Sequence, residues 1–170
     1  MTELVTPDLR WHVSWAETVI EFTEDYPHGS GLPPEGHDVT LEGCAAFVTE
    51  RLRGADPEAT RPEGIVLCDY FWITDGEEVV GFLALRHELT PWLLDQGGHI
   101  GYSVRPSRRR QGHASRALAL ALIRAKELGL ERVLLTCDED NLGSRRTIES
   151  AGGVYEDTRQ DKRRYWITIG

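Results

Sequence analysis

The chain has 170 residues, of which 40% are hydrophobic and 28% charged, and its formal net charge at pH 7 is −9; this length favours one domain over residues 1–170. No stretch approaches the ~18 apolar residues of a membrane span, the first residues do not resemble a secretory signal, and the acidic balance argues against general nucleic-acid binding. The three cysteines, Cys44, Cys68 and Cys137, lack disulfide or metal-binding spacing, which indicates buried thiols in a reducing cytoplasm.

Two helices are predicted in the first third of the chain. Apolar residues recur at helical spacing over 11–26, and Pro27 predicts the end of this helix. A loop rich in Gly and Pro follows over 27–40, and a second helix is predicted over 41–53. Residues 55–64 again have the composition of a loop.

A β-hairpin is predicted next. Residues 65–74, IVLCDYFWIT, are rich in β-branched and aromatic residues, and the dipeptide Asp75-Gly76 is a strong turn signal. The returning strand, 79–87, is apolar at both alternating sets of positions. Helices are therefore expected to cover both faces of the sheet.

The second half alternates strands and helices. After a connection over 88–98, the patterns predict a strand over 99–104 and a helix over 112–128, which Gly129 ends. A strand over 131–137 and a short helix over 141–153 follow, and two antiparallel strands are predicted over 154–157 and 163–169. The simplest assembly is one α/β (α+β) domain around a mixed sheet. We expect the loops 27–40 and 88–98, with Trp92, to shape a binding pocket.

Five arginines crowd the segment 105–117, RPSRRRQGHASRA, at the start of the long predicted helix. The first turn of a helix presents unpaired N–H groups and a partial positive charge, which together bind anions. Gly112 lets a ligand approach the backbone, and arginines add charge-assisted hydrogen bonds to phosphate. The segment therefore predicts a pyrophosphate site, the alternative being a solvated turn. Neither GxxxxGK[ST] nor GxGxxG is present.

A third phosphate-binding signature does fit. Arg109 to Ala114, RRQGHA, satisfies [RQ]-x-x-G-x-[GA], Val104 stands eight residues before Gly112, and Asn141 follows the next predicted strand. With these motifs the chain resembles the GNAT superfamily of N-acetyltransferases from about residue 65 to its end. The resemblance implies a GNAT-like fold, with a central mixed, mostly antiparallel sheet flanked by helices.

The resemblance also implies acetyl-coenzyme A as cosubstrate and no metal. The backbone of Val104 is then expected to pair with the pantetheine arm, and Arg109 and Arg110 are expected to meet phosphates. Asn141 completes the cofactor site, while Arg105 and Arg108 either contact phosphate or are solvated. The pyrophosphate is expected on the backbone N–H groups of Gln111, Gly112, His113, Ala114 and Ser115.

Acetyl transfer needs an amine that loses its proton and a donor for the charge that develops on the thioester oxygen. The resemblance implies direct attack, so no nucleophilic residue is required, and Cys137 is interpreted as a buried strand residue. Glu88 and Tyr102 are the candidate catalytic residues, each considered as the general base. His87 and His99 are further candidates for the same role. Each also has a purely structural interpretation.

One departure from the family pattern keeps an alternative open. Ile148 stands where the family often has a tyrosine general acid, so another group protonates the leaving thiolate or none is needed. Ser144 offers a hydroxyl there, although a helix N-terminal role suits it better. The main hypothesis is an N-acetyltransferase acting on a small amine or a protein amino group; the alternative is an inactive acyl-CoA-binding sensor. We expect no nucleic-acid or membrane partner, and a homodimer is left open.

Overall fold

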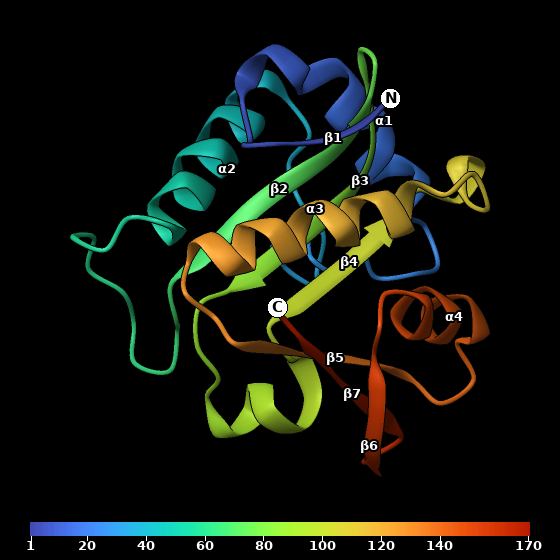
Figure 1. Ribbon diagram of the computed structural model, residues 1–170. Helices are drawn as coiled ribbons and strands as arrows, with labels where there is room; N and C mark the ends of the chain where they lie inside the picture. Colours follow the sequence, from blue (N-terminus) through green and yellow to red (C-terminus); the bar gives the residue numbers. More distant parts are fainter.

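The computed structural model describes residues 1–170 as one seven-stranded sheet with helices on both faces (Figure 1). The strand order is β1-β2-β3-β4-β5-β7-β6, and only the β4–β5 pair is parallel. In chain order the elements are β1 (Thr2–Val5), α1 (His12–Glu21), α2 (Leu41–Gly54), β2 (Cys68–Asp75), β3 (Glu78–Arg86), β4 (Ile100–Val104), α3 (His113–Glu127), β5 (Arg132–Asp138), α4 (Leu142–Ser150), β6 (Val154–Arg159) and β7 (Lys162–Thr168). No helix is both long and apolar enough to cross a membrane.

The central hairpin β2–β3 carries a separate core on each face, as its doubly apolar pattern predicts. Ile73 and Leu83 belong to the cluster that includes residues of α3 and α4. Trp72 and Phe82, their neighbours in sequence, belong to the cluster built with α1 and α2. Because side chains alternate across a strand, this division places the helices on both sides of the sheet.

The sheet opens between β4 and β5. The two parallel strands share one registered pair, Ile100 with Leu135. Beyond that pair, β4 continues to Val104 and β5 to Asp138 without a ladder between them. The helices α3 and α4 begin just past these two strand ends. The gap therefore exposes the inner edges of two central strands to a ligand.

Three local predictions need correction. The N-terminal strand β1 was not predicted, because four residues at a sheet edge are too few to show a period. The first helix ends at Glu21 rather than near residue 26, because the backbone of Phe22, with φ −79° and ψ 81°, leaves the helical conformation. Inside the predicted connection 88–98, Leu93–Gly97 forms a π-helical turn.

Candidate functional site

The turn before α3 has a backbone shaped for an anion. Arg110 and Gly112 adopt left-handed conformations, with φ of 59° and 84°. The backbone N–H groups from Arg110 to Ser115 donate to no acceptor within the protein. A run of free N–H groups at the positive end of a long helix is the arrangement that binds phosphate.

Two of the five arginines of this segment each form two ion pairs. Arg105 forms ion pairs with Glu21 and Glu78, and Arg108 pairs with Asp75 and Glu78. These two therefore tie the turn to neighbouring elements.

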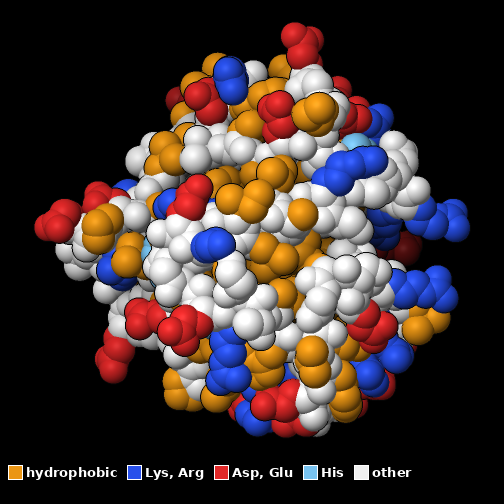
Figure 2. Space-filling view, in the orientation of Figure 1, with side chains coloured by type: hydrophobic (Ala, Val, Ile, Leu, Met, Phe, Trp, Pro, Cys, Tyr) orange, Lys and Arg blue, Asp and Glu red, His pale blue; other side chains and the backbone are white.

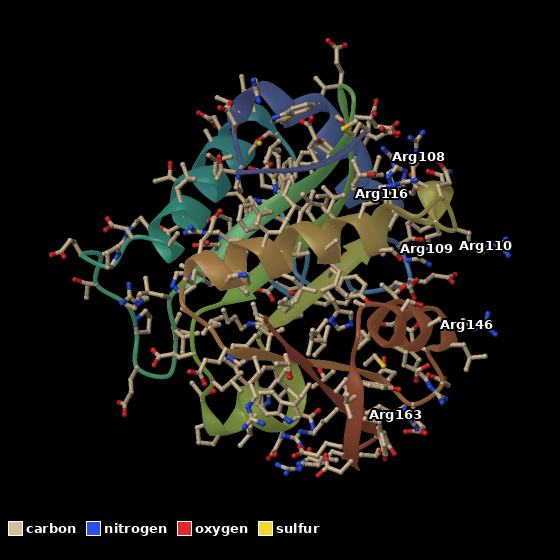
Figure 3. The ribbon with its side chains drawn as sticks, viewed as in Figure 1. Arg108, Arg109, Arg110, Arg116, Arg146 and Arg163 are labelled. Carbon is tan, nitrogen blue, oxygen red and sulfur yellow. The ribbon has the colours of Figure 1, made fainter.

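Arg109 and Arg110 both line the first cavity, at the mouth of the gap. Arg109 donates through Nε to the Val104 carbonyl at 2.9 Å and pairs with the exposed Asp25. Arg110 forms no ion pair and projects to solvent at the edge where α4 presents Arg146 (Figure 3). Figure 2 shows Lys and Arg side chains gathered along this edge, so the acidic chain carries a local positive surface there.

The edge of β4 that faces the gap carries backbone groups with no partner strand, and of these the Val104 carbonyl accepts from Arg109. Hydrogen bonds alternate along an antiparallel ladder, and those of β3–β4 join Arg86 to His99 and Arg105 to Val80. The alternation directs the N–H and C=O groups of Tyr102 and Val104 away from β3. An extended amide chain lying in the gap would pair with them as a neighbouring strand does.

Two cavities meet at this gap. The first has a volume of about 890 Å³ and follows the turn before α3. Of the residues predicted from sequence, it is lined by Tyr102, Val104, Arg109, Arg110, Gly112, His113, Ala114, Ser115 and Asn141. Gln111 does not line it, although its N–H belongs to the same free run. The imidazole of His113 is turned inward, with Nδ1 2.9 Å from Thr2 Oγ1.

The second cavity, of about 450 Å³, lies on the other side of the gap. Residues of both predicted loops line it, among them His28, Gly29, Trp92 and Gly97. The two cavities share Tyr26, His28, Tyr102, Asp138, Asn141 and Ser144. A donor in the first cavity and an acceptor in the second would thus meet beside Tyr102.

Tyr102 lies where the two cavities meet. Its hydroxyl lies 2.9 Å from that of Ser144, and burial raises the pKa of Tyr102 to about 12. The phenol is therefore protonated at neutral pH, whereas a general base has to be unprotonated. Asn141 accepts a hydrogen bond from the Ser144 N–H at 3.1 Å and so caps α4. Ile148 is fully buried in the core.

His28 is a site residue that the sequence analysis missed. His28 lines both cavities, and partial burial together with the nearby charges of Lys162 and Arg86 lowers the pKa of His28 below its ordinary value of 6.5. The backbone is held by Ser103, whose Oγ donates to the His28 carbonyl at 2.8 Å. A neutral imidazole at this position can accept a proton. Its loop, HGSG, gave no signal beyond the histidine itself.

The other predicted bases lie elsewhere. Glu88 is exposed beyond the end of β3 and lines neither cavity. The Nε2 atom of His87 lies 3.0 Å from Oδ1 of Asp69. His99 accepts a hydrogen bond from the Leu134 N–H, and burial lowers its pKa to about 4. The structure therefore brings Tyr102 to the gap and leaves these three side chains away from it.

Comparison with known proteins agrees with this geometry. The acetyltransferase (GNAT) family model matches residues 19–152. No curated protein matches the chain.

Similar solved structures share the fold at low sequence identity. The microcin C7 self-immunity acetyltransferase MccE, in complex with acetyl-CoA and AMP, has a TM-score of 0.72 and 15% identity over 99% of this chain and 92% of its own. RimJ of Mycobacterium smegmatis, in complex with CoA-disulfide, has a TM-score of 0.72 and 20% identity over 98% and 81%. An acetyltransferase of Salmonella typhimurium that modifies the N-terminal serine of ribosomal protein L7/L12 has a TM-score of 0.67 and 16% identity over 99% and 95%.

Proposed function

The chain belongs to the acetyltransferase (GNAT) family, and we propose that it transfers the acetyl group of acetyl-coenzyme A to the nitrogen of an amine. One observation carries the proposal: the free N–H groups from Arg110 to Ser115 and the unpaired edge of β4 lie along one continuous cavity. That continuity suits a ligand with a diphosphate at one end and an amide-containing arm at the other.

The cofactor's parts fit the groups along this path. The N–H run and Arg110 would hold the phosphates, and the Val104 N–H and the Tyr102 C=O would pair with the amides of the arm. Arg109 already spans from the Val104 carbonyl toward the turn, so its guanidinium is held at the point where arm and diphosphate join. When bound, acetyl-coenzyme A supplies an acetyl group activated as a thioester.

His28 is the proposed general base. An amine is mostly protonated at neutral pH and attacks only as the free base. The lowered pKa of His28 keeps the imidazole neutral and able to accept that proton. Because His28 lines both cavities, a proton that leaves an acceptor in the second cavity has a short path to it.

Tyr102 and Ser144 are proposed to return a proton to the departing sulfur. As the nitrogen–carbon bond forms and the carbon–sulfur bond breaks, the thiolate takes a proton from the hydroxyl pair, which regains one from solvent, while the proton lost by the amine goes to His28 and from there to solvent. This pair of hydroxyls supplies the proton donor that Ile148, an aliphatic residue buried in the core, cannot supply. Backbone N–H of Tyr102 is free to stabilise charge on the acetyl oxygen.

The proposal is tested by measuring free thiol released from acetyl-coenzyme A with a panel of amines, and by mass spectrometry of the products. Transfer to at least one amine, above the rate of hydrolysis without amine, is expected. The alternative of an acyl-CoA-binding sensor predicts thermal stabilisation by acetyl-coenzyme A with no transfer to any amine. Related structures include an enzyme that acetylates a protein N-terminus, so peptides belong in the panel.

A further inference from the structure

The second cavity concentrates positive charge in a chain whose net charge is −9. Arg51, Arg86 and Lys162 line it, and its one acidic lining residue is Asp138. Asp138 is already paired with Lys162. Neither arginine forms an ion pair with any carboxylate of the protein, so the cavity retains two uncompensated cations.

Arg51 reaches the cavity from α2 and is held there by neutral partners. Its guanidinium carbon stands 4.8 Å from the ring centre of Tyr70, and Nη1 donates to the Gly31 carbonyl at 2.9 Å. Its Nε is buried without a hydrogen-bond partner. Stacking and one carbonyl fix the position of the charge but do not neutralise it.

Arg86 reaches the same cavity from the end of β3. Its Nη1 donates to the carbonyls of Gly97 and Gly98, both at 3.1 Å. These bonds hold the guanidinium beside the start of β4. The Nη1 atom of Arg86 lies 3.7 Å from the position that a Cβ atom on Gly101 would occupy. The remaining N–H donors have no protein partner.

From these contacts we infer that the acceptor amine carries a carboxylate, which Arg51 and Arg86 bind while the amine faces His28; this rests on the proposed function. Half-buried cations without an acidic partner are costly unless a ligand supplies the anion. A guanidinium matches a carboxylate through two parallel hydrogen bonds, so arginine suits this task. Tyr70 and Trp92 add aromatic walls, and the volume of about 450 Å³ suits an amino acid or the end of a peptide.

The test compares each standard amino acid and a set of dipeptides with the matching carboxamides, in which the acid is neutral and the shape is retained. The acids are expected to have a kcat/KM about ten- to a hundredfold above their carboxamides, the range of one charge-assisted hydrogen bond. In Arg51→Gln and Arg86→Gln this ratio should fall toward one. A merely structural defect would lower the kcat/KM of the acid and of the carboxamide equally and leave their ratio unchanged.

Arg53→Gln is the matched control, because Arg53 lies on α2, pairs with Glu50 at the surface and does not line the cavity. Its acid-to-amide ratio should equal that of the unmodified protein. Carboxamides that react as well as the acids overturn the inference and leave the proposed function standing. If no amine reacts, the proposed function fails, and thermal shifts with N-acetyl amino acids decide the inference: no stabilisation of the unmodified protein overturns it.

Discussion

The hydroxyl groups of Tyr102 on β4 and Ser144 on α4 lie 2.9 Å apart, although 42 residues separate them in the chain. Each is held by its own element, Tyr102 by the β3–β4 ladder and Ser144 by the capped start of α4. The contact closes the inner end of the gap and places two hydroxyls where the two cavities meet. The proposed return of a proton to the departing sulfur depends on this contact.

Removing either hydroxyl should slow acetyl transfer. Tyr102→Phe and Ser144→Ala are expected to lower kcat about ten- to a hundredfold, because the departing thiolate loses its proton donor. The KM for acetyl-coenzyme A should change little. Steady-state kinetics with one reactive amine measures both constants, and Tyr155→Phe, a tyrosine on the exposed strand β6, is the control. An unchanged kcat in both variants would contradict the role of the pair.

His28 should control the acidic side of the pH profile. Since the pKa of His28 is lowered, the rate of the unmodified protein should fall only as the pH drops below the ordinary value of 6.5. His28→Gln should lose about a hundredfold in kcat/KM near pH 7 and no longer show that fall. His87→Gln, outside both cavities, should keep the original profile. A retained acidic limb in His28→Gln would assign it to another group.

The glycine turn should decide cofactor affinity. Gly112→Glu places a carboxylate at the proposed phosphate site and should weaken acetyl-coenzyme A binding by about a hundredfold or more, because like charges repel at close range. Calorimetry measures the affinity directly. Gly129→Glu adds the same charge at the far end of α3, at a similar φ of 80° and with no atom within 4 Å of its Cβ. The strain is thus matched, and Gly129→Glu should bind normally.

The parts of this site differ in how far sequence could predict them. The turn from Arg109 to Ser115 is local, since its glycine, its arginines and its helix lie within one continuous segment. Tyr102 was named from the sequence as a candidate base, but its protonation depends on its burial in the folded chain. His28 belongs to a loop packed against β4, and no local pattern encodes that packing. Glu88 was chosen by its position after a strand, which does not determine which way the chain turns.

Asn141 should contribute separately to stability and to binding. Its side chain caps α4, so Asn141→Ala should cost about 1 kcal/mol and lower the Tm by about 2–4 °C. Acetyl-coenzyme A affinity should also weaken, because the residue lines both cavities. Asn141→Ser restores a capping oxygen and should recover the Tm without recovering the affinity. Undiminished binding in Asn141→Ala would remove this residue from the cofactor site.

Acid should destabilise the fold through the pair β6–β7. The buried Arg164 on β7 forms ion pairs with Glu156 and Asp157 on β6 and donates to the Leu94 carbonyl at 2.8 Å. The hydrogen bond from Arg164 lowers the pKa of Asp157, and those from Trp166 and Arg164 lower that of Glu156.

A folded-state pKa below the unfolded one stabilises the protein above the unfolded value, and this stabilisation is lost as the pH falls through the folded value. The contribution of these two carboxylates to the free energy of unfolding should therefore be steady above about pH 5 and decline below about pH 4, because their stabilisation is lost below the ordinary carboxyl pKa values. Buried His99, whose pKa is lowered to about 4, separately costs stability as the pH falls below about 6.5, in every variant alike. Arg164→Gln should be less stable near pH 7 and show a shallower decline in acid, whereas Arg53→Gln should match the unmodified protein. Urea unfolding followed at several pH values measures both, and an equally steep decline in Arg164→Gln would show that other carboxylates dominate.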